Sequence, residues 1–176
     1  FHNTKSLKFF DISNNKLSEI KSHYFSKLYN LTSIKIENNP IKFIEEYSFQ
    51  NCVNLYNILI LGYLKLVSID DMAFYGTKNL LSLELNNNQI KTLKKDSFTG
   101  LVSLRSIDLR FNLIKSIDDF CLLQLQSIRF IRLEFNFLTI INEKFFKNLT
   151  NLYELYLSYN LIKTINSNAF DSLINL

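Results

Sequence analysis

The sequence predicts an α/β-type repeat solenoid, a curved right-handed rod built from one short motif that is repeated along the chain. The pattern Leu-x-x-Leu-x-Leu-x-x-Asn returns about every 24 residues along the whole chain of 176 residues. The first half of each unit alternates apolar and polar residues, which is the period of a half-buried strand. With one Pro, three Gly and no low-complexity run, the chain contains no segment typical of a linker or of a second domain.

Seven full units follow one another, and a remnant of a preceding unit occupies residues 1–6. The units start at Leu7, Leu31, Leu55, Leu80, Leu104, Ile128 and Leu152. Phe1 precedes Leu7 by the interval that separates Phe25 from Leu31, and Leu176 opens an eighth strand. We therefore expect residues 1–176 to be the middle of a longer array, uncapped at both ends.

The strand-like half of every unit is expected to pair with the same half of the next unit. Because each unit returns the chain to the same edge in the same direction, the pairing is parallel, and the sheet lines the concave face of the rod. The second half, Leu-x-x-Ile-x-x-x-x-Phe-x-x-Leu, returns through turns, short strands or a short 3₁₀ piece on the convex face. Each large apolar side chain that is buried contributes about 1.5–3 kcal/mol, which chain entropy largely offsets.

The third unit departs from the pattern, because it has 25 residues and Tyr63 replaces the Asn. A one-residue slip exchanges the two faces of a strand, so two registers compete. An extra residue before the strand would turn Tyr56, Leu59 and Leu61 inward. We favour an extra residue after the strand, which keeps Leu55, Ile58 and Ile60 inward and exposes Leu59 and Leu61 on the concave face.

The Asn of the motif forms a column of six residues: Asn15, Asn39, Asn88, Asn112, Asn136 and Asn160. We expect their buried amides to bond main-chain groups of neighbouring turns that are no longer paired as strand. Leaving such groups without partners would cost about 1–3 kcal/mol each.

The 24-residue unit that closes with Phe-x-x-Leu, as in Phe25-Ser-Lys-Leu28 and Phe170-Asp-Ser-Leu173, resembles the typical extracellular leucine-rich repeat. Such repeats occur in Toll-like receptors, Slit-type guidance proteins, glycoprotein hormone receptors and lamprey variable lymphocyte receptors. The resemblance covers the whole chain and implies a leucine-rich repeat solenoid. It also implies a non-enzymatic ligand-binding ectodomain, extracellular or at the cell surface, of the kind used in adhesion, signalling and innate immunity.

Two cysteines fall in core columns of the repeat. Cys52 takes a Leu position, and Cys121 takes the small-residue position held elsewhere by Ser48 or Ala73. Three stacked strands separate them by roughly 15 Å, beyond the reach of a disulfide. We expect both to be buried free thiols.

Two Asn-x-Thr sequons, Asn30-Leu-Thr32 and Asn148-Leu-Thr150, fit an extracellular glycoprotein. Asn148 lies in an outer turn and is the better acceptor, since Asn30 directly precedes a strand.

The sequence offers little for catalysis. His2 and His23 fall in the first remnant and in an outer turn, neither Cys has a His or acidic residue beside it, and no phosphate loop or metal-ligand spacing appears. We expect no enzyme activity, no cofactor and no metal. The net charge of +4 is spread over all units, so we expect no nucleic-acid partner, and the longest apolar run is too short for membrane insertion.

The basic and aromatic residues on the strands concentrate in the last three units. All four Arg of the chain lie in the fifth and sixth strands and are expected to face the concave side: Arg105, Arg110, Arg129 and Arg132. The aromatic residues placed with them as candidate ligand contacts are Phe130, Tyr153, Tyr156, Phe111, Phe135 and Tyr159. Arg and Tyr dominate interface hot spots, so this face is the candidate site for a protein ligand.

A purely structural role for these residues is the alternative. In register, Asp108 faces Arg132 and Arg110 faces Glu134, so cross-strand ion pairs would neutralise half of the Arg set. The aromatic column would likewise stack on itself. Arg105 and Arg129, however, share a column that holds no acidic residue, which favours a ligand with an acidic or sulfated group.

The sequence thus favours a fragment of a receptor or adhesion ectodomain that binds a protein ligand on its concave face. One alternative is a matrix or assembly protein that self-associates through the apolar flank of Phe111, Leu113, Phe135, Phe137, Tyr159 and Leu161. Another is an intracellular scaffold of the same repeat. Concentration-dependent mass separates the first alternative from the receptor, and glycan mass separates the second.

Overall fold

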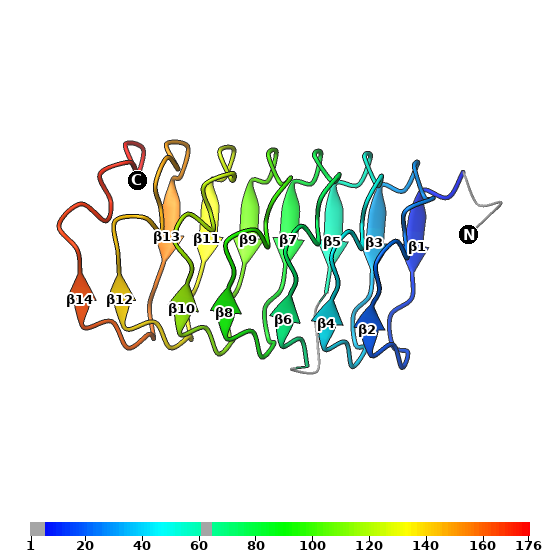
Figure 1. Cartoon of the computed structure of the whole chain (residues 1–176), viewed down its shortest axis with the longest axis horizontal. Coiled ribbons are helices and arrows are strands. Elements are labelled where there is room, and N and C mark those ends of the chain that lie inside the picture. Colours follow the sequence, from blue (N-terminus) through cyan, green and yellow to red (C-terminus); the bar gives the residue numbers. More distant parts are fainter. Residues whose placement is uncertain (1–5, 61–64) are drawn as a thin grey trace.

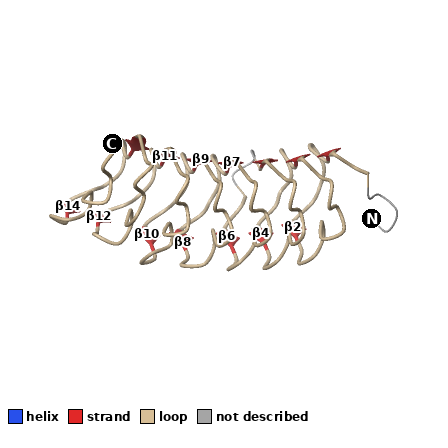
Figure 2. Cartoon of the chain, turned by 90° about the horizontal axis from the view of Figure 1, so that it is seen from above, coloured by secondary structure: helices blue, strands red, loops and turns tan. Residues whose placement is uncertain are grey.

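The computed structural model describes residues 6–60 and 65–176, which form one gently curved rod of stacked turns (Figures 1 and 2). A parallel seven-stranded sheet contains β1 (Phe9–Asp11), β3 (Ser33–Lys35), β5 (Asn57–Leu59), β7 (Ser82–Glu84), β9 (Ser106–Asp108), β11 (Phe130–Arg132) and β13 (Glu154–Tyr156), in that order. On the opposite, convex side lie the two-residue strands β2 (Glu19–Ile20), β4 (Phe43–Ile44), β6 (Ser68–Ile69), β8 (Thr92–Leu93), β10 (Ser116–Ile117), β12 (Ile140–Ile141) and β14 (Thr164–Ile165).

The predicted solenoid is confirmed, with turns and these short strands on the convex side. The described ranges contain no α-helical and no 3₁₀ residue, so the 3₁₀ pieces allowed by the sequence are not used there. Accordingly, no helix within those ranges has the length and apolarity that a membrane span requires.

The register of the strands settles where the extra residue of the third unit lies. Ser33 pairs with Asn57, an offset of one ordinary 24-residue unit, whereas Phe43 pairs with Ser68, one residue more. The additional residue therefore lies between β5 and β6, after the strand. Leu55, Ile58 and Ile60 are buried and Tyr56 is exposed, so the favoured register is confirmed. The side chain of Leu59, together with Leu61 and Tyr63, lies outside the part of the chain that the structure describes.

The core is a set of columns that run along the rod. Each unit from the second to the seventh begins with a fully buried residue: Leu31, Leu55, Leu80, Leu104, Ile128 and Leu152. The Phe rings of the convex half stack from turn to turn, with centroids 5.3 Å apart for Phe25 and Phe49 and 5.6 Å apart for Phe49 and Phe74. In the first and last turns, inward-facing apolar side chains such as Phe10 and Leu157 are only partly buried. Each turn is therefore covered chiefly by its neighbours.

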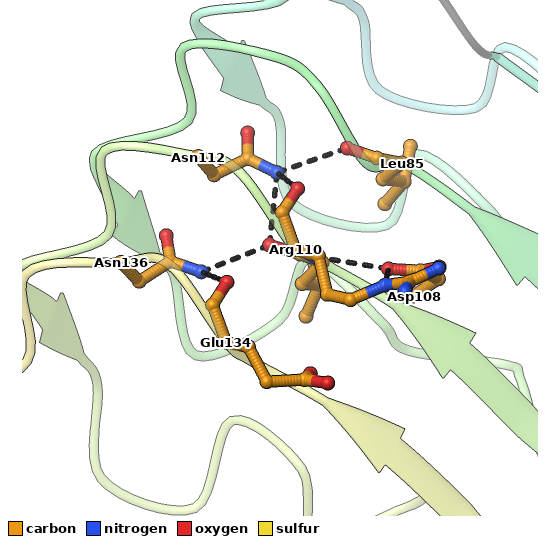
Figure 3. Close-up of polar contacts among 7 residues, drawn as sticks. Leu85, Asp108, Arg110, Asn112, Glu134 and Asn136 are labelled. Carbon is orange, nitrogen blue, oxygen red and sulfur yellow. Dashed lines mark hydrogen bonds and ion pairs between the residues drawn. The ribbon is translucent and has the colours of Figure 1, made fainter. Parts of the chain in front are cut away.

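The Asn column joins each turn to the one before it, as Figure 3 shows for Asn112 and Asn136. The side-chain amide of Asn112 donates to Leu109 O in its own turn and to Leu85 O in the preceding turn, both at 3.0 Å. Its Oδ1 accepts the Ile90 N–H at 3.1 Å. The same pattern holds for Asn39, Asn88, Asn136 and Asn160. Among the described residues, the exposed Asn15 donates to two carbonyls of its own turn and to none of another turn.

A second polar column, which the repeat pattern had not led us to expect, lies one residue before the start of each unit. Its side chains donate to a carbonyl of the preceding turn; they are Asn54, Asn79, Ser127, Asn151 and Asn175, with donor–acceptor distances of 2.6–2.8 Å. The dipeptide Asn-Leu or Ser-Leu/Ile at each boundary was the signal that could have revealed it. Two polar columns therefore tie the turns together at opposite ends of the strands.

Both cysteines are buried free thiols, as predicted. The Cys52 Sγ–H donates to Phe25 O at 3.3 Å, and burial raises its pKa from 9.0 to about 12. Burial also raises the pKa of Cys121, and the nearby Asp118 carboxylate adds to that shift. Neither thiol is placed to act as a nucleophile.

Candidate ligand-binding face

The outward side chains of β9, β11 and β13 form the surface of the sheet at the C-terminal part of the rod. Alternation turns Ile107, Ile131 and Leu155 toward the core. It turns Ser106, Asp108, Phe130, Arg132, Glu154 and Tyr156 outward. The strand register places Arg132 directly between Asp108 and Tyr156.

Asp108 pairs with Arg110, which follows β9 in the same turn, so the predicted cross-strand ion pairs are wrong. The Arg110 guanidinium donates to both carboxylate oxygens of Asp108, with a shortest N–O distance of 2.6 Å. Asp108 is nearly buried and also accepts the Arg110 main-chain N–H, which fixes the pair at the end of β9. Figure 3 shows Arg110 turned toward Asp108 and away from the carboxylate of Glu134. Only one residue, Leu109, separates Asp108 from Arg110 along the chain, and this short link favours their pairing over a pairing with the neighbouring strand.

The guanidinium group of Arg132 lies over an aromatic ring, although the sequence predicted an ion pair with the carboxylate of Asp108. Its guanidinium carbon lies 5.8 Å from the centre of the Tyr156 ring, a cation–π arrangement. The Tyr156 hydroxyl donates to the Glu154 carboxylate, and this bond raises the pKa of Tyr156. Arg132, Tyr156 and Glu154 therefore form one preorganised cluster on the open face.

Arg105, Arg129 and Tyr153 occupy equivalent positions just before β9, β11 and β13. Together with Ser127 and Asn151 they line a shallow hollow of about 180 Å³. No acidic side chain lines this hollow, although Asp108 and Glu154 lie farther along the same strands. The structure thus separates Arg105 and Arg129 from Arg110 and Arg132, although the sequence had suggested one group of four. It also adds Ser127 and Asn151, members of the second polar column.

Phe111, Phe135 and Tyr159 form a ladder of stacked rings beyond the C-terminal ends of the strands. Successive ring centroids lie 4.3 Å apart, with interplanar angles of 10° and 7°. All three residues have φ between 54° and 57°, a left-handed conformation that suits Asn better than an aromatic residue. Earlier turns place Asn14, Asn38 and Asn87 at this position. The ladder is exposed, and Phe137 and Leu161 extend its apolar surface.

A larger hollow, of about 290 Å³, lies on the outer turns around Phe120, Lys144 and Lys147. Both ammonium groups lie 5.8 Å from the centre of the Phe120 ring, and Lys144 also pairs with Asp119 at 2.8 Å. This pairing raises the pKa of Lys144 and lowers that of Asp119. The cations of this hollow already have partners within the chain, so it is a weaker candidate than the sheet face.

Other residues singled out in the sequence lie apart from this face. Asn30 and Asn148 are both exposed in loops between strands, and Asn148 has φ 63°. His23 stacks on Tyr47 in an outer turn. Among the described residues, no group of three His, Cys, Asp or Glu side chains is placed to hold a metal ion.

Comparisons with known proteins point to one family. A family model described as Leucine rich repeat matches residues 57–114 and 126–176, and a second, BspA type Leucine rich repeat region (6 copies), matches residues 1–80. Osteomodulin of Bos taurus is 35% identical over 88 residues, which cover 50% of this chain and 19% of osteomodulin. Toll-like receptor 3 of Boselaphus tragocamelus is 28% identical over 103 residues, which cover 54% of this chain and 11% of that receptor.

Solved structures give the same picture over the full length of the rod. A chain of the glycosylated Toll–Spatzle complex of Drosophila superposes with a TM-score of 0.93 and 27% identity, covering 100% of this chain and 24% of that chain. A chain of the TLR13–ssRNA13 complex superposes with a TM-score of 0.72 and 27% identity, covering 98% of this chain and 28% of that chain. The chain thus spans about a quarter of these solved chains, and less than a fifth of the curated relatives.

Proposed function

Because the chain belongs to the leucine-rich repeat family, we propose that it is a non-catalytic protein-binding module of a receptor or adhesion ectodomain. Its ligand is a protein that docks on the concave face formed by β9, β11 and β13. The resemblance to a chain of the Toll–Spatzle complex, a molecular hub in Drosophila development and innate immunity, supports a receptor function of this kind. The relatives also support an extracellular or cell-surface location.

The observation that carries this proposal is the set of exposed aromatic and Arg side chains on a rigid sheet. Tyr153 and Tyr156 are 52% and 38% exposed, and Arg132 is held over the Tyr156 ring. Such side chains bury large areas on binding and hydrogen-bond at their tips. Because the turns below them are tied by buried Asn side chains, little backbone order would be lost on binding.

A protein ligand suits this face better than a nucleic acid does. One of the similar solved structures is a complex with a single-stranded RNA, so that ligand class needs to be weighed. A groove for single strands follows the phosphates with a continuous row of cations. Here Glu84 and Glu154 lie on the same sheet as the Arg residues, and these carboxylates would repel a polyanion.

The test is a screen of secreted and cell-surface proteins, displayed one per yeast clone, with a tetramer of this chain as the probe. The double variant Phe130→Ser/Tyr156→Ser removes side chains of the proposed face, and Tyr24→Ser/Tyr75→Ser removes two exposed tyrosines of the outer turns as a matched control. We expect at least one clone to bind the parent and the control, and to bind the face variant at least about tenfold more weakly. Binding that both variants lose equally, or that neither loses, would place the ligand elsewhere. An oligoribonucleotide that binds the parent, but not the face variant, would identify a nucleic-acid receptor.

Self-association is the second candidate, and the exposed ladder of Phe111, Phe135 and Tyr159 favours it. With Phe137 and Leu161 the ladder presents adjacent apolar side chains along one flank. Sedimentation equilibrium of the parent and of Phe137→Ser/Leu161→Ser distinguishes the two functions. A mass that rises with concentration in the parent, and not in the variant, supports self-association through this flank.

A further inference from the structure

The hollow before β9, β11 and β13 brings three equivalent side chains together. The Arg129 N–H donates to Arg105 O at 2.8 Å, and the Tyr153 N–H donates to Arg129 O at 3.0 Å. These main-chain bonds place the three side chains side by side on successive turns, about 4.8 Å apart at the backbone. All three are exposed.

The two guanidinium groups of the hollow have no anionic partner among the described residues. Within residues 6–60 and 65–176, Arg105 and Arg129 form no ion pair, whereas Arg110 is bound to Asp108. Two cations held at this backbone spacing would repel each other in water by about 1 kcal/mol. An anion that bridges them would remove this repulsion and would gain charge-assisted hydrogen bonds.

The Ser127 hydroxyl and one N–H of the Asn151 amide are already bonded, so the charged donors of the hollow are its two guanidinium groups, joined by the Tyr153 hydroxyl and the second Asn151 N–H. The Ser127 hydroxyl donates to Val102 O at 2.7 Å, and the Asn151 amide donates to Gln126 O at 2.8 Å. The main-chain N–H groups of Arg105, Arg129 and Tyr153 are likewise bonded to carbonyls of the sheet. The rim is therefore fixed, and the groups that can turn toward a ligand are two cations and a phenol.

We propose that this hollow binds a sulfate or phosphate monoester carried by the protein ligand, an inference that rests on the proposed function. One guanidinium fork satisfies the two oxygens of a carboxylate. A tetrahedral monoester presents three oxygens, enough for both forks and the Tyr153 hydroxyl. The volume of about 180 Å³ holds such a group and part of the side chain that bears it.

The surroundings favour one monoester over the repeated phosphates of a nucleic acid. In the same column the preceding turns carry Tyr56 and Leu81, both exposed, so the cations do not continue along the rod. An aromatic or aliphatic side chain of the ligand would find apolar contacts there. We therefore expect the modified residue to be a tyrosine, whose ring can lie against this apolar part of the column.

The test uses four short peptides of one sequence that carry O-sulfotyrosine, phosphotyrosine, tyrosine or glutamate at the central position. Affinities are measured by NMR titration with the parent chain, with Arg105→Ser/Arg129→Ser and with Lys91→Ser/Lys115→Ser. The lysine pair is a matched control, because it lies on two successive turns that are joined by the same kind of main-chain bond, Lys115 N–H to Lys91 O at 2.9 Å. It also changes the net charge equally. Melting temperatures verify that each variant is folded.

We expect the sulfated and phosphorylated peptides to bind the parent at least about tenfold more tightly than the tyrosine and glutamate peptides. The Arg variant should lose that preference, and the Lys variant should keep it. Equal binding of all four peptides, or equal losses in the two variants, would overturn the proposal. So would an oligoribonucleotide that displaces the sulfopeptide and binds more tightly. If a displayed ligand needs Phe130 and Tyr156 but not the Arg pair, the proposed function stands and this inference fails.

Discussion

At the scale of single residues, the fold depends on polar side chains that are buried because they bond the main chain. Asn112 is 2% exposed and forms hydrogen bonds to two successive turns. A Leu in its place would leave the Leu85 and Leu109 carbonyls and the Ile90 N–H without these partners. The Asn of the motif is therefore as much a part of the core as its leucines.

The substitution Asn112→Ala is expected to lower the free energy of unfolding by about 1–3 kcal/mol, since it leaves the buried Ile90 N–H without its partner and removes one of two amide donors from each of the Leu85 and Leu109 carbonyls. Asn15→Ala is the matched control, because Asn15 is exposed and its hydrogen bonds within the described ranges are to two carbonyls of its own turn. The control should cost less than about 1 kcal/mol, as water can replace its bonds. Urea denaturation followed by circular dichroism measures both. Equal midpoints for Asn112→Ala and the parent would contradict a bonding role for this column.

The Cys52 thiol makes stability depend on pH above the usual thiol pKa. In the folded chain its pKa is about 12, compared with 9.0 when it is unfolded and hydrated. The unfolded state therefore releases the proton first, so this contribution to stability is complete below pH 9 and is lost as the pH rises toward 12. Between pH 8 and pH 11 the parent should lose about 2–3 kcal/mol more than Cys52→Ala does.

Denaturant titrations of both proteins at the two pH values measure that difference, and Cys121 cancels because both proteins retain it. Identical losses would show that Cys52 is not held away from water. Alkylation gives an independent check, since both thiols should react slowly in the folded chain and rapidly in denaturant.

At the scale of the strands, the sequence predicted what depends on period and spacing. The inward leucines, the parallel pairing and the position of the extra residue after β5 all follow from the alternation of faces. The partner of Asp108 could not be predicted in the same way, because Arg110 and Arg132 both lie within reach and local geometry selects Arg110. The sequence predicted that Arg105 and Arg129 share a column, but it did not predict the hollow between them. The rim of that hollow includes Ser127 and Asn151, which belong to the second polar column, and that column was not recognised from the sequence.

The aromatic ladder sets backbone strain against ring stacking. Phe135 has φ 57° and stacks on rings on both of its sides, Phe111 and Tyr159. Phe135→Asn relieves the left-handed backbone but loses both stacking contacts, which are worth about 0.5–1.5 kcal/mol each. Phe135→Ala loses the contacts without that relief.

We therefore expect both variants to be less stable than the parent, with Phe135→Ala the less stable of the two by about 1 kcal/mol. Thermal melts monitored by circular dichroism give the ranking. If Phe135→Asn melts above the parent, the ladder is maintained at a cost to stability, and a role in binding becomes its better explanation.

At the scale of the whole molecule, the fold brings sequence-distant residues into rows that no single unit contains. Arg105, Arg129 and Tyr153 come from three successive turns, and each turn alone presents one side chain. The repeat therefore fixes the scaffold, while the residues between the repeated positions determine what the rod binds. The proposed extracellular location adds a requirement, because a glycan must fit outside both polar columns and away from the sheet face.

N-glycosylation is expected at one of the two sequons and not at the other. Asn148 is exposed in an outer turn and lies outside both polar columns. Asn30, in contrast, occupies the position of the second column, where Asn54 donates to a carbonyl of the preceding turn, and the hydroxyl of its sequon residue Thr32 already donates to Lys8 O at 2.7 Å. When the chain is expressed through a secretory pathway, peptide N-glycosidase should therefore remove mass from Asn148 in most molecules, and from Asn30 in few.

Asn148→Gln should abolish most of the mass shift, whereas Asn30→Gln should leave it nearly intact and serves as the matched control. Equal occupancy would show that the Asn30 position tolerates a glycan, and an unmodified secreted chain would leave the intracellular scaffold as the better interpretation of this repeat.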